Sequence, residues 1–544
     1  MPNLKNAAVL CLVSFAIPAQ AEETSAINQA IIAYNDSFNS TGSEKTKRLV
    51  QAALGFYEIE ENGGADEAKF KAEYYLAQAL YELGLSYSAS HYYMQIIDAG
   101  AAHPYFAKAV EGAVKVAEAM HDETFVPAFL NKRYNKKFYL VPADALAKVH
   151  FIMGRVDYRA NHFKEGTGFL SAVPKTSSYY ALARYLLGLS YIPRPEQKWA
   201  GDPDKALKMF DEVRELQSTD QVVYADLEQV QDLSQVGLAR VYYATGKGQF
   251  GSDGYQKSAS LYHAIPKYDR AWHPGEPERY SPHWEEALFE GAWADFMNDD
   301  PGGALGKLQT LHSPALSDSF QPESWVLESI IYFQNCLYDQ TRVALDQYDK
   351  IYLPMSEAIK PLIEESKDDE FYFNLVHEAQ EGKNGLPTSI RLFLEKNEQY
   401  KSYLNYAGQL DGELGIINST EGLRSAQMAK DLAEMIGRRR GLLVQSAGKF
   451  IKGRLANVAA TLTGFEGQAE IVRLETSSSE KDLLERNDDP ASRLGKQELL
   501  RPDVPDETYE YWAFQGEWWP DELGYYKYTL KNACPVETNT ASGP

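Results

Sequence analysis

The sequence predicts an all-α protein: an α-solenoid of paired helices, then a long helical hairpin or coiled-coil arm, then a short aromatic tail that could form β-strands. Two observations predict the solenoid. Apolar residues recur at helical spacing through most of the chain, and small residues stand where two antiparallel helices would approach closely. One helix pair cannot bury its apolar face alone, so the pattern implies stacked neighbours.

The clearest helix pair lies in Glu73–Asp98 (EYYLAQALYELGLSYSASHYYMQIID). The pattern predicts a first helix that ends near Gly84 and a second that starts near Ser88. Ala77 and Ala89 are the small residues at the expected contact of the two helices. The large residues expected around this contact are Leu76, Leu80, Tyr93 and Ile96.

Similar helix pairs recur through residues 22–355, which we interpret as the solenoid, with residues 22–70 as its N-terminal cap. In a second clear pair, Gly154 takes the small position of the first helix and Gly166 opens the second. The order of small residue, turn, small residue and large residues resembles the tetratricopeptide repeat (TPR) over about half of the chain. Gly166, Ser258 and Thr341 stand where the TPR pattern has Ala, so the repeats are degenerate.

Two further segments carry a narrower resemblance. QNCLYD at Gln334–Asp339 and GEWWPDELGYYKYTLKNAC at Gly516–Cys534 are similar to segments of secreted TPR proteins associated with adventurous gliding motility in bacteria. The resemblance implies a non-catalytic component of the cell envelope that scaffolds other proteins.

The chain changes character after the solenoid. Residues 356–486 predict the helical arm, with segments at Glu357–Glu378, Pro387 to about Leu414, and Glu421–Glu485. Six glycines between Gly437 and Gly467 predict either very close helix packing or a bend. Residues 487–507 read as a polar linker, 508–534 as the aromatic segment, and 535–544 as a disordered tail. Alternation predicts a strand at Tyr525–Leu530, paired with Tyr509–Phe514.

The N-terminus predicts export. Lys5, the apolar run Ala7–Ile17 and the sequence Ala19-Gln20-Ala21 form a secretion signal over residues 1–21, with cleavage near Ala21. We expect a periplasmic or secreted protein without a transmembrane segment in the mature chain. The formal net charge of −23 argues against general binding of nucleic acid or anionic membrane, which would need a local basic patch. The repeat pattern favours other envelope proteins as partners.

Motifs for catalysis are weak. The sequence contains neither HExxH nor GxSxG, and Gly246–Gly251 (GKGQFG) matches GxGxxG after a helix, where a dinucleotide site needs a preceding strand. His273 and His283 could hold a metal together with Glu276 or Glu278, but surface-loop histidines are the commoner explanation. We therefore expect no metal, no cofactor and no enzyme, and an envelope hydrolase is the weaker alternative.

The concave face of the solenoid is the predicted protein-binding groove. Its candidate residues are inferred from their helical phase against the core positions: Tyr74, Gln78, Tyr81, Arg155, Tyr158, Arg184, Arg240 and Tyr243.

A basic stretch without acids, 438–454, has two interpretations. It is either an amphipathic site for an anionic envelope surface, or a helix face whose charges pair with acids such as Glu395, Glu398 and Asp411. Its cations are Arg438, Arg439, Arg440, Lys449, Lys452 and Arg454.

The aromatic segment also has two interpretations: rings displayed to stack on sugars of peptidoglycan, or rings that pack the segment onto the helical body. The rings are Trp512, Phe514, Trp518, Trp519, Tyr525, Tyr526 and Tyr528. Loss of Cys11 with the signal would leave Cys336 and Cys534, which predicts a disulfide in an oxidising compartment. The alternative is two free thiols.

Overall fold

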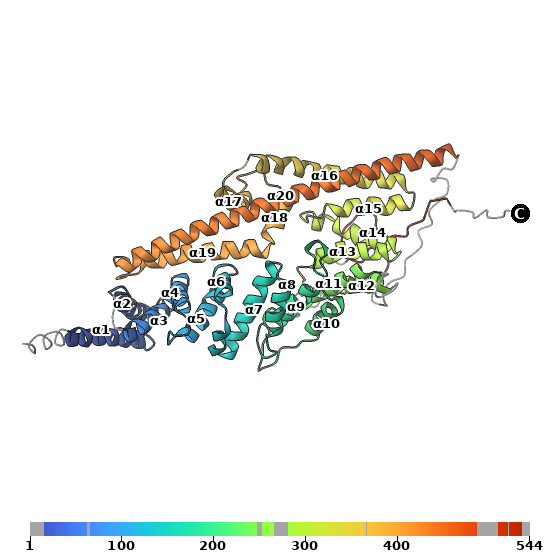
Figure 1. Ribbon diagram of the computed structural model, residues 1–544. Coiled ribbons are helices and arrows are strands. Elements are labelled where there is room, and N and C mark those ends of the chain that lie inside the picture. Colours follow the sequence, from blue (N-terminus) through green and yellow to red (C-terminus); the bar gives the residue numbers. More distant parts are fainter. Residues whose placement is uncertain are drawn as a thin grey trace, which may run out of the picture. The chain divides into compact units, whose positions relative to one another are not determined.

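In the computed structural model, the regular structure of the described residues is helical and ends with α20 at Glu485; the helices are labelled in Figure 1. Among the described residues no strand forms, and Arg194 and Trp199 make one isolated antiparallel bridge. None of the described helices is long and apolar enough to cross a membrane. The structure describes residues 16–62, 66–246, 253–265, 281–365, 367–486, 507, 510–519 and 522–535, with side chains from residue 26 onwards.

The chain divides into two compact units, and each unit combines an early and a late part of the sequence. The first unit comprises Met1–Ala183 and Glu398–Ala447. Its helices are α1 (Ala16–Ser37), α2 (Gly42–Asn62), α3 (Asp66–Glu82), α4 (Ser86–Ala99), α5 (Phe106–Ala119), α6 (Phe125–Arg133), α7 (Ala143–Arg159), α8 (Phe163–Ser171), α19 (Glu398–Ser419) and the first part of α20 (Gln427–Glu485).

The second unit comprises Arg184–Asn397 and Gly448–Pro544. It holds most of α9 (Tyr180–Tyr191) and the second part of α20. Its other helices are α10 (Pro203–Arg214), α11 (Leu227–Thr245), α12 (Asp253–His263), α13 (Trp284–Met297), α14 (Pro301–Leu311), α15 (Glu323–Gln334), α16 (Tyr338–Glu364), α17 (Asp369–Gln380) and α18 (Thr388–Glu395).

A common turn closes five of the helix pairs. Gly84 follows α3 with a φ of 81°, in the left-handed region that glycine adopts without steric cost. The next residue, Leu85, donates its amide to the carbonyl of Leu80, which is the long bond of a Schellman motif, and both side chains are fully buried. The equivalent left-handed residues in the other four pairs are His121, Asn161, Asp299 and Cys336.

Small residues let the paired helices approach closely, as the sequence predicted. Ala77 and Ala89 of the α3–α4 pair are completely buried. In the α7–α8 pair, a Cβ on Gly154 would lie 2.5 Å from Cγ of Leu170, so only glycine fits there. The same constraint appears at Gly112, where an added Cβ would meet the ring of Tyr93. Interior side chains of this kind leave little room to adjust.

The predicted boundary at residue 355 falls inside α16, and the helices after it do not form a separate arm. α19 and the first part of α20 run antiparallel and belong to the first unit (Figure 1). Glu413 of α19 reaches the start of α4, where its carboxylate accepts hydrogen bonds from the amides of Tyr87 and Ser88 and from the Ser88 hydroxyl. Amides at a helix start have no partner within their own helix, so this carboxylate completes α4.

The second part of α20 packs into the second unit. The Tyr348 hydroxyl of α16 donates to the carbonyl of Leu462, 3.0 Å away, and Arg473 pairs with Asp349 at 2.6 Å. α20 is one continuous helix, and the two explanations of its glycines can be compared at Gly448. A Cβ there would overlap the carbonyl oxygen of Asp369, so this glycine permits a close helix contact. The other five glycines face open space.

The predicted strand at Tyr525–Leu530 is wrong. This segment is extended but bonds to α14 instead of to another strand, with the Tyr528 amide donating to the carbonyl of Gly302 at 3.2 Å. Side chains at Gly302 and Gly306 would collide with the backbone of Tyr528 and Tyr526, so these two glycines let the tail lie directly on the helix. The predicted partner strand begins at Tyr509, outside the described residues.

The carboxyl of Glu413 predicts a pH-dependent stability. Burial raises its pKa to about 7 against the opposing effect of its hydrogen bonds, so the folded chain binds this proton more tightly than the unfolded chain. The contribution is fully present below the unfolded pKa of 4.5 and is lost as the pH rises through about 7. Ionisation of Glu413 in the folded chain therefore lowers the free energy of unfolding by up to about 3 kcal/mol above about pH 7.

Glu413→Gln keeps an acceptor oxygen and removes the charge. We expect this variant to be more stable than the parent at about pH 8 and to lose this part of the pH dependence, as measured by chemical denaturation. Glu398→Gln removes an exposed carboxylate on the same helix and is the matched control. It should change neither the stability at about pH 8 nor the pH dependence of stability. Clear destabilisation by Glu413→Gln at about pH 8 would show that the ionised carboxylate is needed.

Candidate functional site

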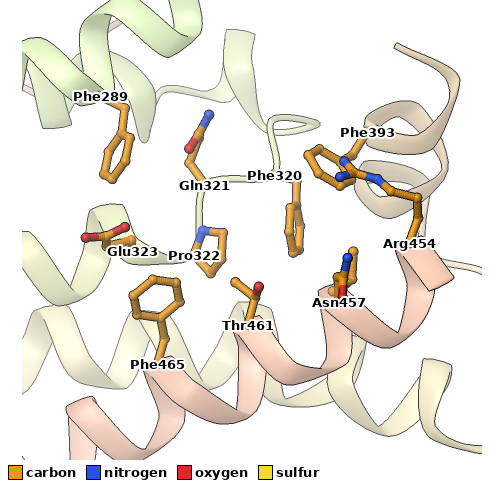
Figure 2. Close-up of a pocket in the computed structure, with 11 residues that line it drawn as sticks. Phe289, Phe320, Gln321, Pro322, Glu323, Phe393, Arg454, Asn457, Thr461 and Phe465 are labelled. Carbon is orange, nitrogen blue, oxygen red and sulfur yellow. The ribbon is translucent and has the colours of Figure 1, made fainter. Parts of the chain in front are cut away.

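An apolar pocket of about 230 Å³ lies within the second unit and is the candidate site (Figure 2). Helix α20 supplies one wall, and the loop that precedes α15 supplies the opposite wall. Single residues from α13 and α18 complete it. The lining residues are Phe289, Phe320, Gln321, Pro322, Glu323, Phe393, Arg454, Asn457, Val458, Thr461 and Phe465.

The wall from α20 follows directly from helical periodicity. Arg454, Val458, Thr461 and Phe465 stand at intervals of three or four residues, which places their side chains on one face. Figure 2 shows Thr461 and Phe465 directed toward the loop at Pro322, and Arg454 directed toward Phe393. The site therefore depends on segments more than a hundred residues apart in the sequence.

Arg454 is the cation of the pocket. Its guanidinium lies 4.8 Å from the ring centre of Phe393, which in turn lies 5.2 Å from the ring of Phe320. Its Nε is buried and has no hydrogen-bond partner, and no described residue forms an ion pair with it. Burial lowers the pKa of Arg454, because a charged guanidinium is less stable away from water.

Glu323 is the acid of the pocket. It opens α15 and lies on the opposite side of the view from Arg454, with Pro322 and Thr461 between them (Figure 2). Burial raises the pKa of Glu323, while a hydrogen bond from Trp293 opposes the rise. The pocket thus has aromatic walls, with Arg454, which forms no ion pair with a described residue, at one end. At the other end it has Glu323, a carboxyl group with a raised pKa.

The predicted groove residues are divided between the two units. Tyr74, Gln78, Tyr81, Arg155 and Tyr158 belong to the first unit, and Arg184, Arg240 and Tyr243 belong to the second. All eight are half-buried.

The arginines of this set form ion pairs inside the helix array. Arg155 donates to Glu123 at 3.0 Å, and Arg240 donates to Glu290 at 2.9 Å. Arg184 lies 3.8 Å from Glu212. Helical periodicity relative to the buried positions identified these arginines as half-exposed. It could not show which acids lie opposite them on the neighbouring helices.

The basic stretch 438–454 is also divided between the units, at Ala447 and Gly448. Arg440 pairs with Asp411 at 2.6 Å, as one interpretation predicted, and Arg438 pairs with Glu434. Glu395 and Glu398, the other predicted acids, pair with Arg391 and Lys401 instead.

The remaining cations of the stretch lie mainly against aromatic rings. Arg439 lies 3.9 Å from the ring centre of Phe125, and Lys452 lies 5.4 Å from that of Tyr372. Lys449 is 3.9 Å from Asp369. Arg454 is the one member of the stretch that lines the pocket, and it forms no ion pair with a described residue.

The aromatic segment is partly packed and partly displayed. Trp518 and Tyr526 pack against the core around α13–α15, together with the buried Leu523. Trp512 is 70% exposed and Trp519 is 54% exposed. Cys336 and Cys534 form a disulfide in the structure, which fastens the end of this segment beside α15, as the cysteine count predicted.

The remaining candidate motifs lie largely outside the described residues. His283 is described, but His273, Glu276 and Glu278 lie outside the described residues, as does most of Gly246–Gly251. No cluster of three His, Cys, Asp or Glu side chains suited to a metal occurs in the described part of the chain.

The pocket was largely missed by sequence reasoning. Arg454 was selected as part of a basic stretch, but nothing indicated that it lies against Phe393 or that Phe320 completes the same pocket. A comparison with models of known protein families finds no match to this chain, and a comparison with curated proteins finds none either. The class that the fold defines is an all-helical protein of paired helices.

The disulfide predicts how the tail is held. Tryptic mapping without reductant should yield one peptide pair joined through Cys336 and Cys534. Replacing both cysteines by serine should speed hydrogen exchange at Gly524, Tyr528 and Ala533, whose amides donate to the helical body. Chain entropy for a separation of 198 residues gives an upper limit of about 5 kcal/mol for the loss of stability.

The loss should fall well below that limit, because α20 packs into the same unit and already restrains the intervening chain. Two free, alkylatable thiols in protein purified under oxidising conditions would show that no disulfide holds the C-terminal segment to the helices.

Proposed function

We propose that this protein is a non-catalytic scaffold of the cell envelope that holds other proteins through a TPR-like helix array. The observation that carries the proposal is the common turn that closes five helix pairs, because a repeated pair is the building unit of a solenoid. Solenoids present extended surfaces, and such surfaces serve to bind other proteins.

The TPR assignment is supported by the small residues at the contacts within helix pairs. The spacing of the turns is longer than the TPR period of about 34 residues: Gly84, His121 and Asn161 are 37 and 40 residues apart. We therefore propose degenerate repeats with lengthened connections. A role in a gliding-motility assembly remains part of this proposal and depends on the resemblance of the two short segments alone.

The envelope location is supported by the secretion signal and by the Cys336–Cys534 disulfide. Disulfides persist in oxidising compartments and are rare in the cytosol. A periplasmic or secreted location accounts for both features.

A second function, binding of cell-wall glycan, is favoured by the exposure of Trp512 and Trp519. Indole rings stack on the apolar faces of sugars. Pull-down with purified peptidoglycan, using Trp512→Ala with Trp519→Ala as the comparison, distinguishes this function from the scaffold.

The scaffold proposal predicts that a charge on the expected binding surface blocks partner capture. Tyr81→Glu and Tyr243→Glu add charge at two half-buried groove residues without removing an arginine ion pair. We expect each to reduce cross-linked partners recovered from an envelope extract by about tenfold or more, since like-charge or desolvation penalties at an interface are of that size. Circular dichroism should remain unchanged.

Tyr139→Glu provides the matched control, because Tyr139 is 73% exposed and outside the expected surface. Capture that survives both groove substitutions would exclude this surface. Recovery of peptidoglycan alone, with no protein partner, would replace the scaffold by the glycan-binding function.

A further inference from the structure

We propose that the α20 pocket, lined by Arg454 and Phe320, binds a small apolar monocarboxylate, such as a short arylalkanoic or branched aliphatic acid. This site goes beyond the scaffold function, because it takes a free small molecule. The size, the lining and the single unpaired cation of the pocket carry the proposal.

The volume fits a ligand built around one ring. An engineered apolar cavity of about 150 Å³ accepts benzene, whereas pockets for drug-sized ligands span about 300–1,000 Å³. The present pocket, at about 230 Å³, lies between these values. It has room for one ring or a branched chain with a short polar arm.

The walls select an apolar body. Four phenylalanine side chains, together with Pro322 and Val458, contribute most of the lining (Figure 2). The neutral amide of Asn457 and the hydroxyl of Thr461 add polar groups without charge. Transfer of apolar surface from water to these walls favours binding.

The charge selects a single carboxylate. Arg454 is the only cation among the lining residues, and its buried Nε has no hydrogen-bond partner. A guanidinium suits a carboxylate through paired N–H donors. A phosphate dianion would require further cations, which this lining does not provide.

Glu323 fixes the direction of the ligand. A carboxylate would be repelled near Glu323 and attracted near Arg454, and these two residues lie on opposite sides of the pocket. The acid group of the ligand therefore points to the Phe393 end, and its apolar body extends toward Phe465 and Phe289.

The test compares an acid with its uncharged amide on the full-length protein. Phenylpropionate and phenylpropanamide are titrated by ligand-observed NMR. We expect the acid to bind with a dissociation constant in the millimolar range or below. The amide should bind at least about tenfold more weakly than the acid, since a charge-assisted hydrogen bond is worth at least that factor.

Variants locate the binding. Arg454→Met should weaken the binding of phenylpropionate by about tenfold or more. Arg454→Lys should restore part of the lost affinity. Lys452→Met is the matched control, because Lys452 lies two residues away against Tyr372 and does not line the pocket. It should bind the acid as the parent does, and Glu323→Gln should bind the acid at least as tightly.

Several results would overturn the proposal: no binding of phenylpropionate at millimolar concentrations, equal affinity for acid and amide, or undiminished binding by a folded Arg454→Met variant. A third probe, acetyl-Asp-Phe-amide, presents the same ring and carboxylate within a capped peptide. Tighter binding of this peptide than of phenylpropionate would overturn the free-acid site in favour of a docking site for a partner polypeptide. The outcome is independent of envelope-protein capture, so the two proposals can fail separately.

Discussion

The return of the C-terminal helices onto the helix pairs is the constraint on which the structure depends. In the first unit, Glu413 of α19 satisfies amides at the start of α4 that no residue of α4 can reach. Such a buried carboxylate is costly unless every lone pair is used, so its position relative to α4 must be closely defined. α19 is therefore part of the core of this unit.

The second unit depends on the same constraint through different contacts. α20 meets α16 through the Tyr348 hydroxyl, the Arg473–Asp349 ion pair and the ion pair of Arg342 with Glu480. Because α20 is held there, its Arg454–Phe465 face forms one wall of the candidate pocket. A change that loosens α20 would remove the pocket even if none of the lining residues were altered.

Local patterns predicted the features that are local in origin. Burial of Ala77 and Ala89, the turn at Gly84 and the helical content follow from residues close in sequence. The disulfide was predictable because only Cys336 and Cys534 would remain if the predicted signal were removed. The strand at Tyr525–Leu530 failed because alternation cannot reveal whether an extended segment bonds to a strand or, as here, to the glycine face of α14. Likewise, helical phase placed Arg155 and Arg240 at half-exposed positions but could not reveal Glu123 and Glu290 across the helix contact.

The candidate pocket required information that no single stretch contains. Its residues come from α13, the loop before α15, α18 and α20, and only their packing brings Arg454 to Phe393. The sequence identified a basic stretch but not which of its cations pair with acids and which lie against aromatic rings. That distinction depends on the tertiary positions of acids such as Asp411 and Asp369.

Hydrogen exchange in a chain shortened after Asn397 tests most directly whether the C-terminal helices complete the helix pairs. The shortened chain lacks α19 and α20, while α3 and α4 keep their full sequence. The account predicts that the amides of Tyr87 and Ser88, and α4 as a whole, exchange much faster than in the full chain. Unchanged protection of α4 would show that the helix pairs are complete by themselves and would contradict the account.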